Sequence, residues 1–373
     1  MSCDYNTLPH AGIQSLHPYV PGKTTDALTA EKGLQHVIKL ASNENPLGCS
    51  QTVLDTFKQL APHDMATYCI SRENPLNTAL AEHTGLQRDN IILSNGSDIL
   101  FHLLLECFAL HTGKHIITHE YAFITYEVQA NTLGIPLRKI PLQSDWTVDI
   151  DAIINACTEK TAIIFLANPN NPTGLLIQPE SIERLLNHIP ESTLLVLDEA
   201  YHEYTPKNQQ SDVSAWLQKY PNLVITRTFS KAYGLAALRL GYALGNPEII
   251  ALLHRIQLPF TISGPSMLAG IAALKDQAFI QKSIETNQTG LTQVIPVLDK
   301  LGLTHLPTAC NFITFDCGRN ATEVDSHLQA RGIITRPLNP YGLTQHLRVT
   351  IGTHEQNAYF LKTLPLCLKE TVS

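Results

Sequence analysis

A chain of 373 residues, 44% of them hydrophobic and 16% charged, can bury one large core and a smaller second one, so two domains are expected. Its formal net charge of −7 is spread over interspersed acidic and basic residues, which argues against a binder of nucleic acid or of an anionic membrane and leaves small molecules or another protein as partners. No segment resembles a signal peptide or a membrane helix, and the eight scattered cysteines form no CxxC pair, so a cytoplasmic protein with reduced thiols is expected.

The first forty or so residues contain Pro9, Pro18, Pro21 and Gly22 and are predicted to form an extended arm. After it, short apolar runs rich in β-branched residues alternate with helical patterns, which is typical of βαβ units around a mainly parallel sheet. These runs span residues 115–118, 162–167, 194–197, 223–226 and 241–244.

Beyond residue 264 the pattern changes to long helical stretches followed by strand-like runs at 311–315, 332–335 and 347–351, which predicts a smaller α/β unit. The predicted organisation is an arm and the start of the small domain at 1–45, a large domain at 46–264 and a small C-terminal domain at 265–373. Because ligands of such folds bind at the carboxyl ends of the strands, the residues after each run are the candidate functional groups.

The turn Ser94-Asn95-Gly96-Ser97-Asp98 opens the apolar segment 99–110, whose continuous hydrophobicity predicts a helix buried on all sides. Free backbone amides at the start of that helix would bind a phosphate. Taken alone, the turn also fits an ordinary N-cap by Ser97 or Asp98.

The run 115–118 is followed by Tyr121, whose ring could stack on a flat cofactor, although a single tyrosine at a strand end is usually a packing residue. The four-residue spacing of His111, His115 and His119 resembles a metal-binding helix face. A glycine and strand-like residues interrupt any helix there, so no metal site is expected.

Two further runs end in polar groups. The run 162–167 continues into an asparagine- and proline-rich segment at 168–174, where Asn171 can donate to a phenolate-like oxygen and a tight proline turn is the alternative. The run 194–197 ends in Asp198, and a carboxylate at the end of a buried strand is costly unless it meets a cation. The protonated ring nitrogen of a pyridoxal cofactor is such a cation.

Lys231 follows the run 223–226 in a stretch with few bulky polar side chains. Desolvation lowers the pKa of an amine and makes it a usable nucleophile and proton carrier, whereas an isolated lysine beside a turn is usually a surface residue. Ser230 and Arg239 flank it, and a serine, an arginine and backbone amides together make a phosphate site.

This ordered set of motifs resembles fold-type I pyridoxal-phosphate aminotransferases over nearly the whole chain. The resemblance implies an α/β fold in which a large domain holds a mainly parallel sheet of the seven-stranded type between helices, with a smaller C-terminal α/β domain and an N-terminal arm. The motifs are Asn43-Glu44-Asn45-Pro46, Gly96-Ser97-Asp98, Tyr121, Asn171-Pro172-Thr173-Gly174, Asp198-Glu199-Ala200-Tyr201, Ser230-Lys231 and Arg239.

A finer resemblance is to histidinol-phosphate aminotransferases. It is carried by four segments, Leu16-His17-Pro18-Tyr19-Val20-Pro21-Gly22-Lys23, residues 40–48 around Asn43, residues 332–337 ending in Arg336-Pro337, and residues 347–352 around Arg348. Two positions depart from the family pattern: Ile99 replaces the acidic residue after Gly-Ser-Asp, and Cys69-Ile70 follow Tyr68 in place of a proline and an acidic residue.

The resemblance implies roles toward pyridoxal 5'-phosphate. Lys231 is the catalytic residue that bonds to the cofactor, Asp198 pairs with the ring nitrogen, and Asn171 and Tyr201 hold the ring oxygen. Tyr121 stacks on the ring. The phosphate is held by Gly96, Ser97, Asp98, Ser230 and Arg239, with Tyr68 reaching it from the other subunit of a homodimer.

The resemblance also implies a substrate site. In the run 347–351 alternate residues face opposite ways, so Arg348 can enter the site while its neighbours pack. Arg348 and Arg336 would bind the carboxylate of glutamate in one half-reaction and the substrate phosphate in the other, because a guanidinium fork suits both anions. Tyr19 and Asn43 are expected to assist them.

The implied reaction transfers an amino group between L-glutamate and imidazole acetol phosphate, giving L-histidinol phosphate and 2-oxoglutarate in histidine biosynthesis. An aromatic-amino-acid aminotransferase and a threonine-phosphate decarboxylase-like lyase stay open as alternatives, because the same arginines would accept their substrates. A non-catalytic pyridoxal-phosphate-binding regulator would have lost the lysine or gained a DNA-binding domain, and Lys231 is present.

Overall fold

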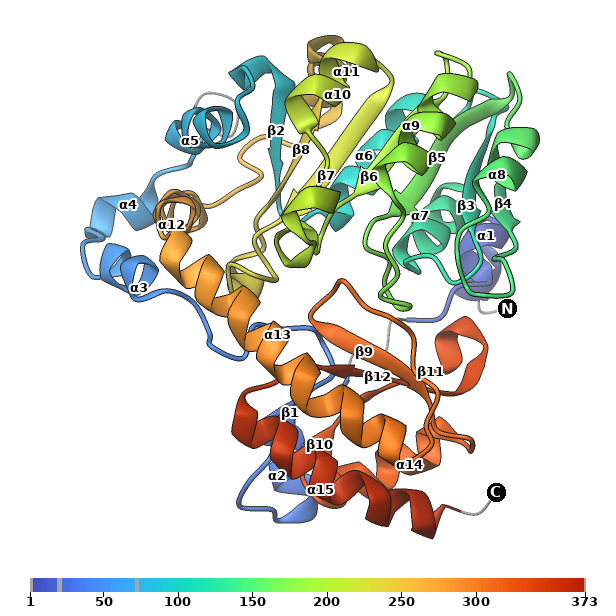
Figure 1. Cartoon of the computed structure of the whole chain (residues 1–373). Helices are drawn as coiled ribbons and strands as arrows, with labels where there is room; N and C mark the ends of the chain where they lie inside the picture. Colours follow the sequence, from blue (N-terminus) through green and yellow to red (C-terminus); the bar gives the residue numbers. More distant parts are fainter. Residues whose placement is uncertain (1–2, 19–21, 71–73, 372–373) are drawn as a thin grey trace.

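The structure is a computed structural model and describes residues 3–18, 22–70 and 74–371. A large α/β unit and a smaller one lie one above the other, and the long helix α13 (Gln277–Lys300) runs along both (Figure 1). The predicted α/β class with a large and a small unit is confirmed.

The large unit is built on a seven-stranded sheet in the order β2-β8-β7-β6-β5-β3-β4. β8 runs antiparallel to both neighbours, and the remaining pairs are parallel. The strands are β2 (Ile91–Ser94), β3 (His115–His119), β4 (Leu137–Ile140), β5 (Thr161–Ala167), β6 (Leu194–Asp198), β7 (Leu223–Thr228) and β8 (Gly241–Gly245). The five predicted runs are all strands, whereas β2 and β4 were not predicted.

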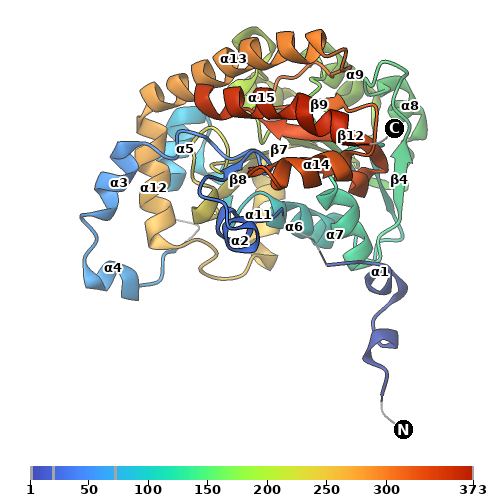
Figure 2. The ribbon, with the colours of Figure 1, turned by 90° about the horizontal axis from the view of Figure 1, so that it is seen from below.

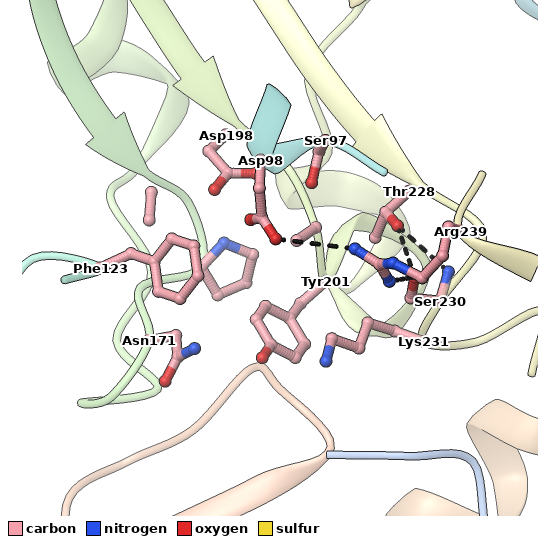
Figure 3. Close-up of a pocket in the computed structure, with 13 residues that line it drawn as sticks. Ser97, Asp98, Phe123, Asn171, Asp198, Tyr201, Thr228, Ser230, Lys231 and Arg239 are labelled. Atoms are coloured by element: carbon pink, nitrogen blue, oxygen red, sulfur yellow. Dashed lines mark hydrogen bonds and ion pairs between the residues drawn. The ribbon is translucent and has the colours of Figure 1, made fainter. Parts of the chain in front are cut away.

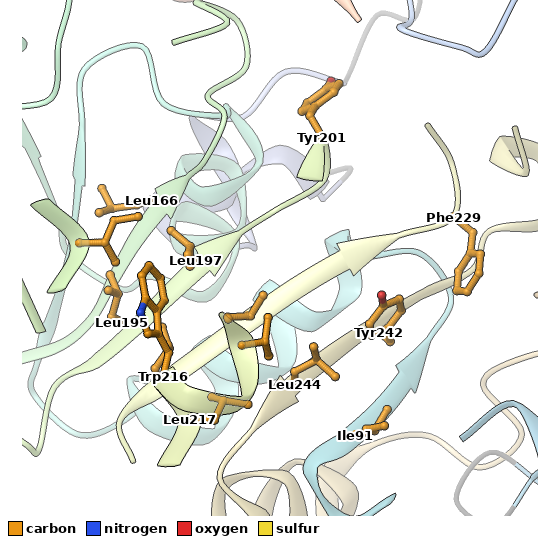
Figure 4. Packing of buried hydrophobic residues seen from close by; sticks show 14 of the residues in the cluster. Ile91, Leu166, Leu195, Leu197, Tyr201, Trp216, Leu217, Phe229, Tyr242 and Leu244 are labelled. Atoms are coloured by element: carbon orange, nitrogen blue, oxygen red, sulfur yellow. The ribbon is translucent and has the colours of Figure 1, made fainter. Parts of the chain in front are cut away.

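Successive residues of the central strands point to opposite faces of the sheet, and helices cover both faces. Leu195 and Leu197 of β6 belong to one core cluster and Val196 to the other (Figure 4). Helices α6 (Asp98–Phe108), α7 (Thr125–Leu133) and α11 (Pro247–Ile256) cover the second face. The first is covered by α5 (Pro75–Thr84), α8 (Ile150–Ala156), α9 (Pro179–His188), α10 (Val213–Lys219) and α12 (Gly264–Lys275).

One sequence prediction for this unit needs correction. Helix α6 is not buried on all sides, because Glu106 is exposed and Ile99 keeps 37% of its surface accessible. Helix α12, which the predicted boundary at residue 264 assigns to the small domain, packs against α5 and α3 (Gln51–Phe57). The domain boundaries themselves stay a prediction.

The smaller unit contains an antiparallel sheet in the order β11-β12-β9 and a two-stranded parallel pair of β1 and β10. Its core lies between these strands and helices α13, α14 and α15. The elements are β1 (Ile38–Lys39), β9 (Phe312–Asp316), β10 (Ile333–Ile334), β11 (Arg336–Leu338), β12 (Leu343–Thr350), α14 (Ala321–Gln329) and α15 (His354–Glu370).

The N-terminal region is only partly extended. Helix α2 (Thr25–Lys32) forms because Thr24 caps the amide of Ala27 and Gly33 ends the helix in the left-handed conformation. Its buried Leu28 packs with Ile334 of the small unit. Residues 3–9 project from the body (Figure 2), whereas α1 (Ala11–Gln14) packs against α7, where the His10 ring lies 3.0 Å from the carbonyl of Thr132. The prediction of an extended arm over the first forty residues is therefore wrong for α2.

The remaining short elements are α4 (Pro62–Ala66) and the 3-10 turns η1 (Tyr5–Thr7), η2 (Arg88–Asn90), η3 (His202–Tyr204), η4 (Lys207–Gln209), η5 (Ala236–Leu238) and η6 (Asn339–Tyr341). Within the described residues, no helix combines the length and the apolar character that a membrane crossing requires.

Candidate active site

A pocket opens at the carboxyl edge of β5, β6 and β7, beside the start of α6 (Figure 3). It gathers side chains from five separate segments of the chain. The lining residues are Ser97, Asp98, Phe123, Ala167, Pro169, Asn171, Asp198, Ala200, Tyr201, Thr228, Ser230, Lys231 and Arg239. Eight of these were predicted as site residues, and parallel strand ends explain why they meet.

Asp198 is the last residue of β6 and is only 4% exposed. Burial raises the pKa of its carboxyl to about 7, although the Tyr126 hydroxyl, 2.8 Å from Oδ2, and the Thr226 hydroxyl, 3.3 Å from Oδ1, both stabilise the charged form. A buried carboxyl that faces a pocket and has a raised pKa is suited to a cationic partner.

Lys231 follows β7, and its Nζ atom donates to the carbonyl of Ser42 at 3.2 Å. The amine also lies 5.7 Å from the centre of the Tyr201 ring. Burial first, and the positive charge of Arg348 second, lower the pKa of the amine to about 8. A larger share of Lys231 is therefore neutral and nucleophilic near neutral pH than of an ordinary lysine.

Asn171 and Tyr201 lie on the side of the pocket toward the small unit (Figure 3). The Tyr201 hydroxyl accepts a hydrogen bond of 2.8 Å from Nδ2 of Asn43, and burial raises the pKa of the phenol. Asn43 is in turn held by Thr350 of β12, whose Oγ1 accepts a hydrogen bond of 2.9 Å from the backbone N–H of Asn43. Two donor groups therefore face the same end of the pocket.

The opposite end of the pocket is an anion site. Ser97 occupies the N-cap position of α6 without a capping hydrogen bond from its side chain, so the first amides of the helix stay available as donors. Arg239 lies 3.5 Å from the Ser230 hydroxyl through Nη1 and 3.7 Å from Asp98 through Nη2. Although Ser97 stands at the N-cap position, its side chain does not cap the helix, as the alternative interpretation would require.

Two glycines make room for this anion site. Gly96 has a φ of 79°, and a Cβ atom there would lie 2.5 Å from Nη2 of Arg239. At Gly241, the first residue of β8, a Cβ atom would lie 2.5 Å from the amide nitrogen of Ser97. Side chains at either position would displace the donors that surround the anion.

The aromatic wall of the pocket is Phe123 and not Tyr121, which corrects the sequence prediction. Tyr121 has a φ of 56°, and its carbonyl accepts from Nδ2 of Asn170 at 2.9 Å. The Tyr121 ring lies 5.4 Å from the ring of Trp146, and Tyr121 lines a neighbouring pocket. The ring of Phe123, two residues later, lines the site instead. In the sequence, only its position shortly after the end of a predicted strand could have indicated it.

Arg348 borders the pocket without lining it. Its Nη1 atom donates to Oδ1 of Asn171 at 2.5 Å and its Nη2 atom to the carbonyl of Ala41 at 2.7 Å, while its buried Nε has no protein partner. Arg336 is the residue on β11 that pairs with Arg348 on β12. The predicted alternation along β12 holds, since Leu347 and Val349 are buried in the core of the small unit.

The predicted residue Tyr68 lies apart from the pocket. Tyr68 is 76% exposed, and its ring stacks on Phe260 at 4.4 Å. Tyr19 lies outside the described residues. Sequence reasoning also missed Thr228, whose hydroxyl lies 3.0 Å from that of Ser230 and adds a polar group to the anion site.

The arrangement fits pyridoxal phosphate. An amine able to bond to an aldehyde, a buried carboxyl for the ring nitrogen, two donors for the ring oxygen and an anion site for the phosphate stand in one pocket beside a flat aromatic wall.

Comparison with known proteins gives the same family. The description "Aminotransferase class I and II" matches residues 35–364. The chain is 51% identical over 364 residues to histidinol-phosphate aminotransferase 2 of Legionella pneumophila (strain Lens), covering 98% of this chain and 99% of that protein. It is 38% identical to histidinol-phosphate aminotransferase 2 of Nitrosospira multiformis, covering 99% of this chain and 93% of that protein.

Among solved structures, the histidinol-phosphate aminotransferase of Sinorhizobium meliloti in complex with pyridoxal-5'-phosphate superposes with a TM-score of 0.87 at 28% identity. The superposition covers 97% of this chain and 98% of that chain. With the family description matched over most of its length and a lysine, a buried carboxyl and an anion site in one pocket, this chain belongs to the class I and II aminotransferases.

Proposed function

We propose that this chain is a histidinol-phosphate aminotransferase that uses pyridoxal 5'-phosphate to transfer an amino group between L-glutamate and imidazole acetol phosphate. The reaction rests on one observation, the presence of Lys231 and the buried Asp198 in one pocket that ends in an anion site. The choice of substrate rests on 51% identity to a histidinol-phosphate aminotransferase over 98% of the chain.

The bound cofactor supplies an aldehyde carbon and a ring that accepts electrons, and the protein supplies the rest. Asp198 would hold the ring nitrogen in its charged form, Asn171 and Tyr201 would donate to the ring oxygen, and Phe123 would provide an apolar surface for the ring. Ser97, Ser230 and Arg239 hold the phosphate. The Nζ atom of Lys231 would carry the proton to and from the substrate carbon that bears the nitrogen.

The substrate side of the pocket is assigned to Arg348 and Arg336, which lie opposite one another on β12 and β11. Two guanidinium groups on neighbouring strands can bind the carboxylate of glutamate in one half-reaction and a phosphate in the other. Asn43 holds Tyr201 and is assigned a supporting role, as is Tyr19 from the arm.

We also propose a homodimer. Large apolar side chains lie exposed near Tyr68, which the dimer would place against the partner's site. They are Met65, Ile70, Leu258 and Phe260, exposed by 66%, 63%, 78% and 49%. An apolar surface of this kind marks an interface. A cytoplasmic location goes with this role, since all eight cysteines are free thiols.

The test is a substrate comparison with the purified protein. We expect visible absorbance from the lysine-bound cofactor and amino transfer from histidinol phosphate to 2-oxoglutarate with a higher kcat/KM than from phenylalanine. Preference for phenylalanine would replace the proposal by an aromatic-amino-acid aminotransferase, and release of carbon dioxide from threonine phosphate would indicate the lyase. A colourless protein after incubation with pyridoxal phosphate would overturn the reaction itself.

A further inference from the structure

Tyr126 lies behind the pocket, in the first turn of α7, and none of its surface is exposed. Its ring stacks on Phe165 of β5 with a centroid distance of 4.9 Å and meets Phe101 of α6 edge-on at 5.0 Å. It also meets Phe123, the aromatic wall of the pocket, edge-on at 5.8 Å. Three aromatic neighbours therefore fix the direction of the tyrosine ring.

The hydroxyl of this ring reaches Oδ2 of Asp198 at 2.8 Å. Burial and the nearby Asp198 raise the pKa of the phenol well above its usual range, so Tyr126 keeps its proton and acts as the donor. Packing among aromatic rings requires no hydroxyl, and a buried hydroxyl costs free energy unless it finds a partner. The hydroxyl of Tyr126 is thus placed for the carboxylate.

Asp198 receives a second, longer bond on its other oxygen, since the Thr226 hydroxyl lies 3.3 Å from Oδ1. The backbone amide of Ala200 also favours the charged carboxylate, so three protein donors hold Asp198. The remaining acceptor capacity of the carboxylate is left for the pocket that Asp198 lines.

We propose that Tyr126 is a positioning residue: its hydroxyl fixes the Asp198 carboxylate in the orientation and the charged state that keep the ring nitrogen of the cofactor protonated. The proposal rests on the cofactor role assigned to Asp198 above. In metal sites, hydrogen bonds from surrounding residues orient the side chains that bind the metal. The Tyr126 hydroxyl would orient Asp198 toward a protonated ring nitrogen in the same way.

The experiment compares wild type with Tyr126→Phe, which keeps the ring and removes only the hydroxyl. Both proteins are loaded with pyridoxal phosphate labelled with ¹⁵N in the ring, and the ¹⁵N chemical shift reports the protonation of that nitrogen. We expect the shift of Tyr126→Phe to move from the protonated toward the neutral value given by Asp198→Asn. The Kd for the cofactor should weaken about tenfold, as expected for loss of a hydrogen bond to a charged group.

The control is Tyr359→Phe, which removes a hydroxyl bonded at 2.7 Å to the carbonyl of Arg331 in the small unit. Its ¹⁵N shift and Kd should match wild type. Thr226→Val removes the longer bond to Asp198 and should move both readouts in the same direction by less. If Tyr126→Phe folds poorly, the ¹⁵N shift and the Kd of Thr226→Val still test whether donors to Asp198 control the protonation of the ring nitrogen.

A double-mutant cycle separates positioning from packing. If Tyr126 acts through Asp198, adding Tyr126→Phe to Asp198→Asn should leave the Kd unchanged. A further loss of affinity in that background, or a Tyr126→Phe protein with the wild-type ¹⁵N shift and Kd, would overturn the proposal. A wild-type protein that forms no visible bond with the cofactor would instead overturn the proposed function.

Discussion

The Nη1 atom of Arg348 lies 2.5 Å from Oδ1 of Asn171, so a strand of the small unit contacts the loop that carries this pocket residue. Because Oδ1 already accepts from Arg348, the Nδ2 group of the same amide is left to donate. The same guanidinium is the second cause, after burial, of the lowered pKa of Lys231. Arg348 therefore acts on two groups of the pocket.

Replacing Arg348 by Gln should raise the pKa of Lys231, because loss of a nearby positive charge favours the protonated amine. The rate at which the cofactor-free protein attaches pyridoxal phosphate, followed by visible absorbance, should rise with pH, and the midpoint of this rise should lie at higher pH in the variant than in wild type. Arg184→Gln removes an arginine paired with Asp151 at the surface and serves as the control. An unchanged midpoint would show that Arg348 has no electrostatic effect on Lys231.

Lys231→Ala should abolish the visible absorbance and reduce turnover by about a thousandfold or more, since nucleophile and proton carrier are lost together. Turnover is measured with saturating pyridoxal phosphate so that weakened binding does not mask the result. Lys58→Ala, which removes an exposed lysine paired with Asp55, should behave as wild type. Undiminished turnover of Lys231→Ala would contradict the assigned mechanism.

Gly96→Ala should weaken cofactor binding by about tenfold, because the added Cβ would lie 2.5 Å from Nη2 of Arg239 and displace it. Gly85→Ala is the matched control: its φ of 70° imposes similar backbone strain, but no atom lies within 4 Å of the new Cβ. Both variants should lose about 1 kcal/mol of stability. Equal Kd values for the cofactor in the two variants would rule out the clash as the cause.

Asp198→Asn should stabilise the cofactor-free protein at pH 8. Folding raises the pKa of this carboxyl from 3.8 to about 7, so its contribution to stability is full below pH 4 and is lost as the pH rises through 7. Between pH 4 and pH 8 the wild type should lose on the order of 4 kcal/mol relative to the variant in urea unfolding. Asp151→Asn, at an exposed carboxylate, should show no such difference.

Leu258→Asp should weaken self-association by about a hundredfold if the exposed apolar surface around Tyr68 is the dimer interface. Sedimentation velocity over a range of concentrations measures the change. Leu366→Asp introduces the same charge at a leucine of α15 that is 50% exposed, and it should leave association unchanged. Equal weakening by both substitutions would place the interface elsewhere or show a general loss of stability.

The sequence alone was sufficient to predict the pocket residues that stand at or just after the end of a buried strand. Lys231 and Asp198 stand at strand ends, where a polar residue after an apolar run is easily seen, and their meeting follows from parallel topology. β4 gave no such signal because it is a short edge strand whose middle residues, Arg138 and Lys139, are exposed.

The remaining errors have local causes. Tyr121 and Phe123 are two residues apart, and only the positive φ of Tyr121 decides which ring enters the pocket. The bond from Tyr126 to Asp198 joins a helix to a strand 72 residues later, and no pattern along the chain indicates it. Packing between distant elements, rather than local propensity, sets both.

The antiparallel direction of β8 limits how this enzyme can vary. Because β8 returns from the edge at which β7 ends, the single connection at residues 229–240 carries Lys231 near its start and Arg239 near its end. Lys231 and Arg239 are thus separated by the length of one loop. An insertion or deletion in this loop would change that spacing, whereas the loop after β5 could change length without moving either residue.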